Sequence, residues 1–338
     1  ALARTRSLSV GYYRDKPMRR WVDGLLGRER IDAVVAFSST MAQYLPDRRD
    51  AEVVRVADFV DVDSDKWRQY ATETRFPRSA VYRYEAWALA SWESEVVDVC
   101  DAVSVVSEAE RVLVPLPSKE CYSRIRVVPN GVDAQYFDPV QAGESPYGPD
   151  RQVVVFTGAM DYHANVDGVC WFVKHVWARI RKRAPEAEFW IVGSKPTPAV
   201  IALAEVPGVS VTGRVPDVRP YLRHATLAVA PLRLARGVQN KVLEALAMER
   251  LVVASPQALQ GLERPLPASA MSAETGEEFL LKVCDLLEAD EVGAACGRRY
   301  VLECYDWDRN LDQISDLVIT QGNSWSDTTR HAVEGEEC

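Results

Sequence analysis

Residues 227–254 read LAVAPLRLARGVQNKVLEALAMERLVVA, and this stretch decides the fold class. Two short apolar runs, LAVA and LVVA, open and close it, and a loop containing Gly237 leads into a helical pattern over residues 239–248. The apolar residues of that helix recur at the i, i+4, i+7 and i+8 spacing of one buried face: Val238, Val242, Ala245 and Leu246. A strand, a loop, a helix and a second strand in this order predict a parallel α/β domain.

The same alternation runs through the rest of the C-terminal half. Strands are predicted over residues 153–157, 188–192 and 209–212, and helices over 166–183, 197–204, 218–223 and 276–289. With the two apolar runs of the first stretch, this makes five strands, each followed by a helix. The pattern predicts a doubly wound sheet of ordinary size.

The N-terminal half has the same character but fewer strands. We expect strands over residues 32–37, 53–56, 102–106 and 126–128, helices over 18–26 and 80–98, and a further helix capped by Ser107. Residues 129–150 contain four prolines and three glycines without a regular period, which indicates a connection between domains. We therefore expect a partial N-terminal domain over 1–135, a linker over 136–150, a C-terminal domain over 151–305, a helix over 306–320 that braces the first domain, and a disordered tail over 321–338.

Composition narrows the classes of function. The chain has 338 residues, 47% of them hydrophobic, and a net charge of -9, which argues against a nucleic-acid partner. Its seven cysteines form no CxxC pair and show no metal-ligand spacing with the four histidines, so we expect free thiols in a reducing cytoplasm and no metal. No uncharged apolar run approaches the ~18 residues that are needed to span a bilayer.

Residues 1–31 differ from the remainder in charge. They carry eight arginines and lysines against three acidic residues, a net charge of +5, which leaves -14 on the rest of the chain. A solvated helix face is one explanation, and an anionic surface or acceptor facing this end is the other. We expect the helix over 18–26, which contains Trp21, to pack on its own sheet; peripheral contact with the inner face of the membrane is the alternative.

The junction between loop and helix in the first stretch is the strongest candidate site. Ligands of open α/β sheets bind at the carboxyl ends of strands, and a helix N-terminus there attracts a diphosphate. Gly237 lets the backbone approach a ligand closely. Lys241 lies one turn into the helix, where it can neutralise phosphate, and Glu244 lies a turn further, where it can accept hydrogen bonds from ribose hydroxyls. The alternative is a plain surface pair of Lys241 and Glu244, worth ~0.2–0.5 kcal/mol.

Five segments resemble those of the family-4 GT-B glycosyltransferases in order and spacing. They are PNGVD at 129–133, FTGAMDYHANVDGVCWF at 156–172, WIVGSKP at 190–196, VTGRVPDVRPYL at 211–222 and NKVLEALAM at 240–248. The resemblance implies two Rossmann-like doubly wound domains that face a cleft. It also implies transfer of a sugar from a UDP- or GDP-linked donor to a glycan or lipid-linked acceptor, with retention and without a metal. DFVDVDSDKW at 58–67 further resembles sugar transferases of exosortase/PEP-CTERM exopolysaccharide loci.

The resemblance assigns roles to individual residues. It implies that Glu244 contacts the nucleotide ribose and that Lys241 holds the diphosphate. It implies that backbone amides at the start of the helix reach the donor sugar or its β-phosphate, and that Gly158 lets its loop approach the phosphates. The other residues expected at the helix start, beside the base or toward the cleft are Gly237, Val238, Gln239, Asn240, Arg214, Val215, His163 and Asn165. For His163, a solvent-exposed loop histidine is an equal alternative.

The sequence departs from the family at one motif position. The first acidic residue of the E-x7-E motif falls eight positions before Glu244, where this chain has Arg236. An arginine accepts no hydrogen bond, but it can grip a phosphate or an acidic sugar with two donors. Arg236 or Arg233 would then replace the arginine that many relatives place beside the lysine.

The N-terminal domain is expected to be incomplete. It has about four strands where the family has about six or seven, and no strand followed by a glycine-rich turn opens it, so roughly 80–110 residues would be missing. Closure about a hinge near Asn130 would bring donor and acceptor together. Two rival interpretations remain, a non-catalytic nucleotide-sugar binder, which Arg236 favours, and a sugar-nucleotide epimerase of the same architecture. A nicotinamide oxidoreductase is excluded, because no G-x-G-x-x-G follows a strand.

Overall fold

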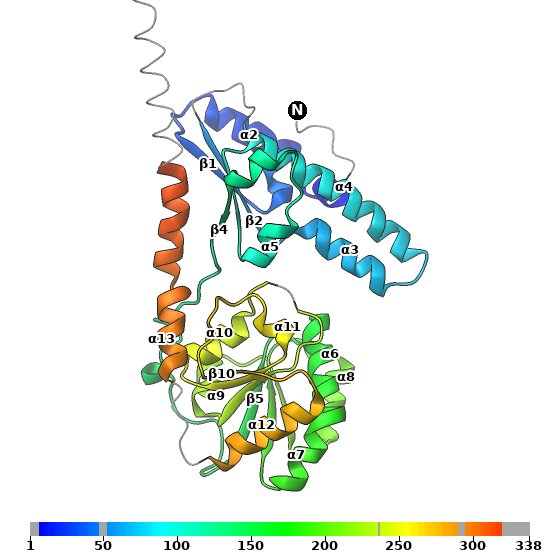
Figure 1. Cartoon of the computed structure of the whole chain (residues 1–338), viewed down its shortest axis with the longest axis vertical. Helices are drawn as coiled ribbons and strands as arrows, with labels where there is room; N and C mark the ends of the chain where they lie inside the picture. The colour runs from blue at the N-terminus through cyan, green and yellow to red at the C-terminus, as the bar shows by residue number, and fades with distance from the viewer. Residues whose placement is uncertain (1–6, 47–52, 236, 290–294, 320–338) are drawn as a thin grey trace, which may run out of the picture. The chain divides into compact units, whose positions relative to one another are not determined.

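The chain folds into two compact units. The structure, a computed structural model, describes residues 7–46, 53–235, 237–289 and 295–319. One unit comprises Ala1–Pro129 with Asn310–Cys338, and the other comprises Asn130–Arg309. Each unit consists of strands covered by helices (Figure 1). The division between the units falls inside the PNGVD segment at 129–133.

The second unit is built on a six-stranded parallel sheet. In spatial order its strands are β10 (Ala270–Ser272), β9 (Leu251–Ala254), β8 (Leu227–Ala230), β5 (Val153–Thr157), β6 (Glu188–Val192) and β7 (Val209–Gly213). Numbered along this unit and read from β7, the order is 3-2-1-4-5-6, that of a dinucleotide-binding doubly wound fold. The order reverses between β5 and β8, and every residue of these two strands is buried. The crevice beyond their carboxyl ends is therefore the expected ligand site.

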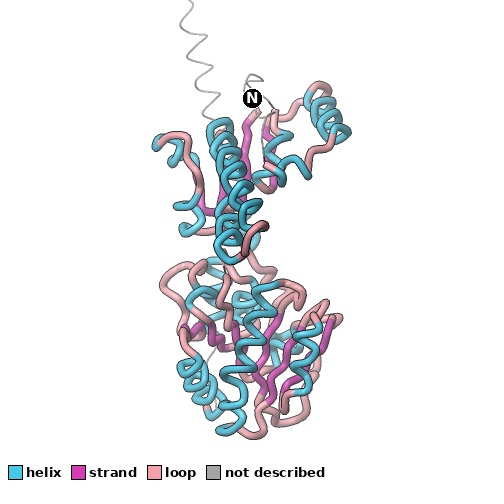
Figure 2. The backbone as a smooth tube through the Cα atoms, turned by 90° about the vertical axis from the view of Figure 1, so that its right-hand side faces the viewer, coloured by secondary structure: helices cyan, strands magenta, loops and turns pink. Residues whose placement is uncertain are grey.

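Helices lie on both faces of this sheet (Figure 2). They are α6 (His163–Phe172), which continues through a π turn (Val173–Trp177) into α7 (Ala178–Arg183), then α8 (Pro198–Ile201), α9 (Arg219–His224), α10 (Asn240–Ala247), α11 (Pro256–Leu259), α12 (Gly276–Glu288) and α13 (Ala295–Cys304). α12 packs beside α7, and α13 packs beside α10. Between α12 and the sheet, the ring of Phe172 lies tilted against that of Phe189 at a centroid distance of 5.0 Å and meets that of Phe279 edge to face at 6.0 Å.

The five strands expected in this half are confirmed. β10 and α13 are not among the expected elements. β10 has only three residues, too few for a period to appear, and α13 contains two arginines and a glutamate among its ten residues. Both elements form because the sheet and α10 offer them a surface.

The first unit contains a four-stranded parallel sheet in the order β1-β2-β3-β4. Its strands are β1 (Ala33–Phe37), β2 (Val54–Val60), β3 (Ala102–Val105) and β4 (Ile125–Val127). Its helices are α1 (Leu8–Tyr12), α2 (Lys16–Leu26), α3 (Asp63–Glu73), α4 (Arg78–Val99) and α5 (Glu108–Leu113). The four expected strands are thus confirmed, and α3 with α4 forms a helical pair (Figure 1).

Helix α3 was not expected, because its sequence is polar. Its first turn is held by carboxylates from other helices. Glu110 accepts a hydrogen bond from the backbone N–H of Val62 at 2.7 Å, and Glu93 accepts one from the N–H of Ser64 at 3.1 Å. Burial raises the pKa of Glu93 to about 8. The DFVDVDSDKW segment therefore spans the end of β2 and the start of a helix that distant residues cap.

Helix α2 does not pack as the sequence predicted. None of its residues is buried, and Trp21 is 57% exposed. A polar contact attaches the helix instead: Arg19 donates to the carbonyl oxygen of Tyr44 at 3.3 Å and lies over the Tyr44 ring. Of the expected apolar face, Val22, Leu25 and Leu26 are only half-buried and Trp21 is exposed.

The last described segment is helical from residue 307 to residue 319. Leu317 and Val318 pack against Val54, Val56 and Ala102 of the first unit. The tail expected to be disordered, 321–338, lies outside the described residues. Within the described ranges, no helix has the length and apolar character required to cross a bilayer. The six described cysteines are free thiols.

Candidate functional site

Two glycines shape the carboxyl edge of the second sheet beside the point where its strand order reverses. Gly158 follows β5 with a φ of +153°, and Gly193 follows β6 with a φ of +156°. A Cβ on Gly193 would lie 1.7 Å from the carbonyl oxygen of Gly158, so only glycine fits there. A Cβ on Gly158 would lie 2.7 Å from Nδ2 of Asn165. The loop after β5 is therefore a closely packed turn of backbone at the expected ligand edge.

Lys241 of α10 lies against this loop. Its Cε is 3.4 Å from the position that a Cβ on Gly158 would occupy, and its Nζ is 5.5 Å from the centroid of the Phe156 ring. Burial lowers the pKa of Lys241 to about 8, although Glu244 attracts the ammonium group. Burial raises the pKa of Glu244, and Lys241 opposes that rise. A half-buried ammonium group beside the backbone of the loop after β5 can bind an anion, because the anion would replace the hydration that the ammonium group has lost.

The N-terminus of α10 lies at the same edge, because α10 follows β8. Its N-cap residue, Gln239, is extended, and no side-chain cap is found among the described residues. Gly237 is buried with a φ of +59°, and a Cβ on Gly261 would lie 2.2 Å from the Gly237 carbonyl oxygen. Gly237 therefore packs closely against Gly261, and the first N–H groups of α10, which have no acceptor within the helix, are the groups that this edge offers to a ligand. Val238 packs partly against the core, and Asn240 is exposed.

Asn165 and His163 lie at the start of α6 but differ in surroundings. Asn165 is buried, and its Nδ2 donates to the carbonyl oxygen of Ala159 at 2.9 Å, which straps the glycine loop. Its Oδ1 is buried with no hydrogen-bond partner among the described residues. His163 is exposed in the first turn of the helix. Asn165 is thus placed to hold the loop through its amide nitrogen, and its Oδ1 is a buried acceptor that the described residues leave unused.

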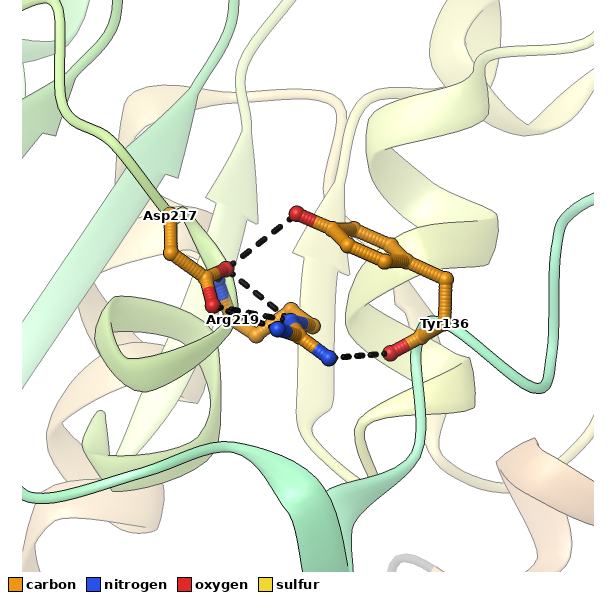
Figure 3. Close-up of polar contacts among 3 residues, drawn as sticks. All are labelled: Tyr136, Asp217 and Arg219. Atoms are coloured by element: carbon orange, nitrogen blue, oxygen red, sulfur yellow. Dashed lines mark hydrogen bonds and ion pairs between the residues drawn. The ribbon is translucent and has the colours of Figure 1, made fainter.

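Arg214 and Val215 lie on the loop after β7. Arg214 is exposed, and Val215 packs against the core. A clamp holds the following residues of this loop (Figure 3): Arg219 pairs with Asp217 through Nε at 3.0 Å, donates to the carbonyl oxygen of Tyr136 at 3.1 Å and lies 4.1 Å from the Tyr136 ring centroid. The Tyr136 hydroxyl is 3.3 Å from Asp217. The segment after PNGVD is therefore fastened to the loop that carries Arg214.

Comparisons with known proteins agree with this geometry. Residues 151–289 match the family model described as Glycosyl transferases group 1, whereas a search of the curated proteins finds no match. Among solved structures, the chain is similar to a glycosyltransferase from Rickettsia africae ESF-5, with a TM-score of 0.63, 12% identity, and coverage of 90% of this chain and 80% of that one. It is similar to the catalytic domain of starch synthase IV from Arabidopsis thaliana bound to ADP and acarbose, with a TM-score of 0.61, 11% identity, and coverage of 92% and 79%. It is also similar to WaaG, a glycosyltransferase involved in lipopolysaccharide biosynthesis, with a TM-score of 0.61, 14% identity, and coverage of 88% and 81%.

The chain has the GT-B fold. At such low identity the solved structures establish the fold alone. The family match adds support for sugar transfer and for an enzyme of the glycosyltransferase class. In the GT-B frame, the expected residues divide into three groups. Lys241, Gly158 and Asn165 lie together, Gly237 and Gln239 lie at the helix start, and Arg214 and Val215 lie on a separate loop of the same edge.

The two arginines proposed for phosphate binding have different outcomes. Arg233 forms a two-pronged ion pair with Asp167 of α6, one contact being 2.9 Å from Nε to Oδ2. It would have to leave that carboxylate before it could grip a phosphate. Arg236 lies outside the described residues.

Several residues that support this GT-B site were not recognised in the sequence. Arg298 of α13 donates to the carbonyl oxygens of Phe137, Ala247 and Ala134 at 2.7, 2.9 and 3.1 Å, which ties α10 to the segment after PNGVD. Gly297 lets α13 approach α10, since a Cβ there would lie 2.9 Å from Cδ2 of Leu246. Only Gly193 had a sequence signal, because it follows an apolar strand directly, as Gly158 does.

Proposed function

We propose that this GT-B protein transfers a sugar from a UDP- or GDP-linked donor to a glycan or lipid-linked acceptor with retention of anomeric configuration. We place it in the synthesis of exopolysaccharide or another cell-surface polysaccharide, on the resemblance of its DFVDVDSDKW segment. One observation carries the proposal: Lys241 and the start of α10 lie against the glycine loop after β5, where the strand order reverses. The free thiols of the described cysteines support a cytoplasmic location.

The site would supply positive charge where the leaving group becomes negative. As the bond between the sugar C1 and the phosphate oxygen breaks, the nucleoside diphosphate takes the electron pair. The Lys241 ammonium group and the amides of α10 would stabilise it. The acceptor oxygen forms the new bond to C1, on the face from which the diphosphate departs, and its proton passes to the diphosphate. Since Lys241 can serve as the cation, we propose transfer without a metal, and EDTA is expected to leave the rate unchanged.

Glu244 would orient the nucleotide. It lies i+3 from Lys241 on the same half-buried face of α10, and its carboxylate can accept two hydrogen bonds from vicinal ribose hydroxyls. Because burial raises its pKa, a bound hydroxyl pair would replace lost hydration and favour the ionised form. We therefore expect Glu244→Gln to weaken nucleoside binding without lowering the affinity for inorganic diphosphate.

The proposal is tested by calorimetric titration with UDP and GDP and by transfer assays with their glucose conjugates. Lys241→Met and Glu244→Gln are each expected to reduce transfer on the order of 10²-fold or more. Lys182→Met and Glu205→Gln are matched controls, because both residues are exposed and lie just before strands, at the opposite edge of the sheet. Near-normal turnover in both site variants would refute the assignment.

The rival functions give different readouts in the same assays. A protein that binds nucleotide but neither transfers nor hydrolyses the sugar would be a non-catalytic binder. Epimerised donor formed without an acceptor would identify an epimerase. Either result would overturn the proposed transfer.

A further inference from the structure

The first unit contains a pocket of about 390 Å³ at the carboxyl ends of β1 and β2. Ligand pockets of small molecules are typically about 300–1,000 Å³. Its lining includes Ser38, Thr40, Asp63, Lys66, Trp67 and Tyr70, which follow the two strands directly or lie on α3. The carboxyl edge of a parallel sheet is where open α/β folds bind ligands. The pocket belongs entirely to the first unit, whereas Lys241 lies on α10 of the second unit.

One wall of the pocket is aromatic and held in place. Trp67 contacts Tyr70 edge to face at a centroid distance of 5.9 Å and lies 5.3 Å from the ring of Tyr82 on α4. These contacts fix the indole ring between α3 and α4. Phe37, which also lines the pocket, is 70% exposed. A fixed, partly exposed aromatic ring is a platform on which the C–H face of a sugar ring can pack.

The other wall is polar, and the two charged side chains that line it are of opposite sign. Lys66 pairs with Asp63 at 3.9 Å, so the ammonium and carboxylate groups compensate each other. The hydroxyls of Ser38 and Thr40 lie 3.0 Å apart. Together these four side chains offer donors and acceptors, which suit a molecule that carries several hydroxyls. An anionic ligand would have to compete with Asp63 for Lys66.

The backbone at this edge is strained in two places. Ser38, directly after β1, has a φ of +76°, and Val60, at the end of β2, has a φ of +64°. Left-handed backbone is unfavourable for residues other than glycine, and most of all for a β-branched one such as Val60. Such strain gathers at binding sites because the surrounding structure enforces it. The N–H of Ser38 donates to the carbonyl oxygen of Asp58 at 2.7 Å, which holds the turn against β2.

We infer that this pocket binds an uncharged sugar residue of the acceptor, with Trp67 as the platform and the Asp63–Lys66 pair and the Ser38 and Thr40 hydroxyls as hydrogen-bonding partners. That the bound sugar is an acceptor rests on the proposed function, whereas the binding site rests on the geometry of the first unit alone. The inference identifies the acceptor as a glycan with an uncharged terminal sugar.

The test uses saturation-transfer NMR of the whole protein with methyl glycosides of glucose, galactose and mannose. Methyl glucuronide and glucose 1-phosphate serve as anionic counterparts. We expect magnetic saturation to pass from the protein to at least one uncharged glycoside. Trp67→Leu and Lys66→Gln should each lower the affinity for that glycoside at least tenfold. Lys66 is partly exposed, so the second variant keeps the test valid if Trp67→Leu fails to fold. Trp87→Leu is the matched control, since Trp87 is 55% exposed on α4 and does not line the pocket.

The same samples are titrated with UDP and GDP, which separates the two proposals. Glycoside binding that Trp67→Leu and Lys66→Gln leave intact would overturn the pocket assignment, as would preference for the anionic sugars. Nucleotide binding without glycoside binding would also overturn the pocket while sparing the proposed function. Glycoside binding without nucleotide binding would support the pocket and defeat the proposed transfer.

Discussion

Replacing Lys241 with methionine is expected to stabilise the protein and to weaken donor binding. Burial lowers the pKa of this lysine from 10.5 to about 8. Each pKa unit corresponds to about 1.4 kcal/mol, so the folded state carries the ammonium group at a cost of at most about 3 kcal/mol at neutral pH. Methionine keeps most of the aliphatic volume beside Phe156 and removes the charge. At pH 7 the variant should therefore gain up to about 3 kcal/mol in free energy of unfolding.

The gain should depend on pH in a defined direction. Below pH 8 the lysine is protonated in both the folded and the unfolded state, and the cost of the buried charge is present in full. Between pH 8 and 10.5 the folded state releases its proton first, so the unfolded state binds more protons and the stability of the unchanged protein rises with pH. The advantage of Lys241→Met should shrink over this range and vanish near pH 10.5. Urea denaturation followed by circular dichroism at several pH values measures it.

Binding should respond in the opposite sense. A hydrogen bond from a charged donor contributes about 1.5–3 kcal/mol, so loss of the ammonium group should weaken UDP or GDP binding by about 10- to 150-fold. The affinity of the unchanged protein should fall as pH rises above 8, and that of Lys241→Met should not. Lys182→Met, at the opposite edge of the sheet, should alter neither quantity. A variant that is less stable than the unchanged protein at pH 7, or that binds nucleotide equally well, would refute this reasoning.

Three further predictions concern other parts of the molecule. Because the folded state holds a proton on Glu93 up to about pH 8, stability should fall between pH 4.5 and pH 8 by up to about 1.4 kcal/mol per pH unit, and Glu93→Gln should flatten that slope in urea titrations; an unchanged slope would contradict it. Arg298→Ala removes three hydrogen bonds to carbonyl oxygens and should cost about 2–4 kcal/mol in unfolding free energy; a loss below about 0.5 kcal/mol would show that the contacts are not formed. Gly193→Ala forces a Cβ against the carbonyl oxygen of Gly158 and should lower the free energy of unfolding by about 3 kcal/mol or more. Gly213→Ala, with open space around its Cβ, should lower it by only about 1–2 kcal/mol through backbone strain. Equal thermal midpoints for the two variants would refute the packing argument.

The sequence by itself determined the type and order of most elements. Buried parallel strands are continuous apolar runs. The strands VVVFT at 153–157 and LVVA at 251–254 can therefore be predicted without knowing which strands they pair with. Ser107 caps its helix through a hydrogen bond from the N–H of Glu110, as its position predicted. The loop-to-helix junction with Gly237 and Lys241 was likewise visible, because strand, glycine and helix are neighbours along the chain.

Tertiary structure decided what those elements meet. The polar sequence of α3 forms a helix because Glu93 and Glu110, far along the chain, hold its first turn. No periodicity in the sequence reveals that residue 193 must be glycine because the carbonyl oxygen of Gly158 occupies the place of a Cβ. Nor does any periodicity reveal that Lys241 loses hydration beside Phe156. Helix α2 had the pattern of a packed helix, but none of its residues is fully buried. Propensity and period are properties of neighbours in sequence, whereas desolvation, close approach and pKa depend on groups that only the folded chain brings together.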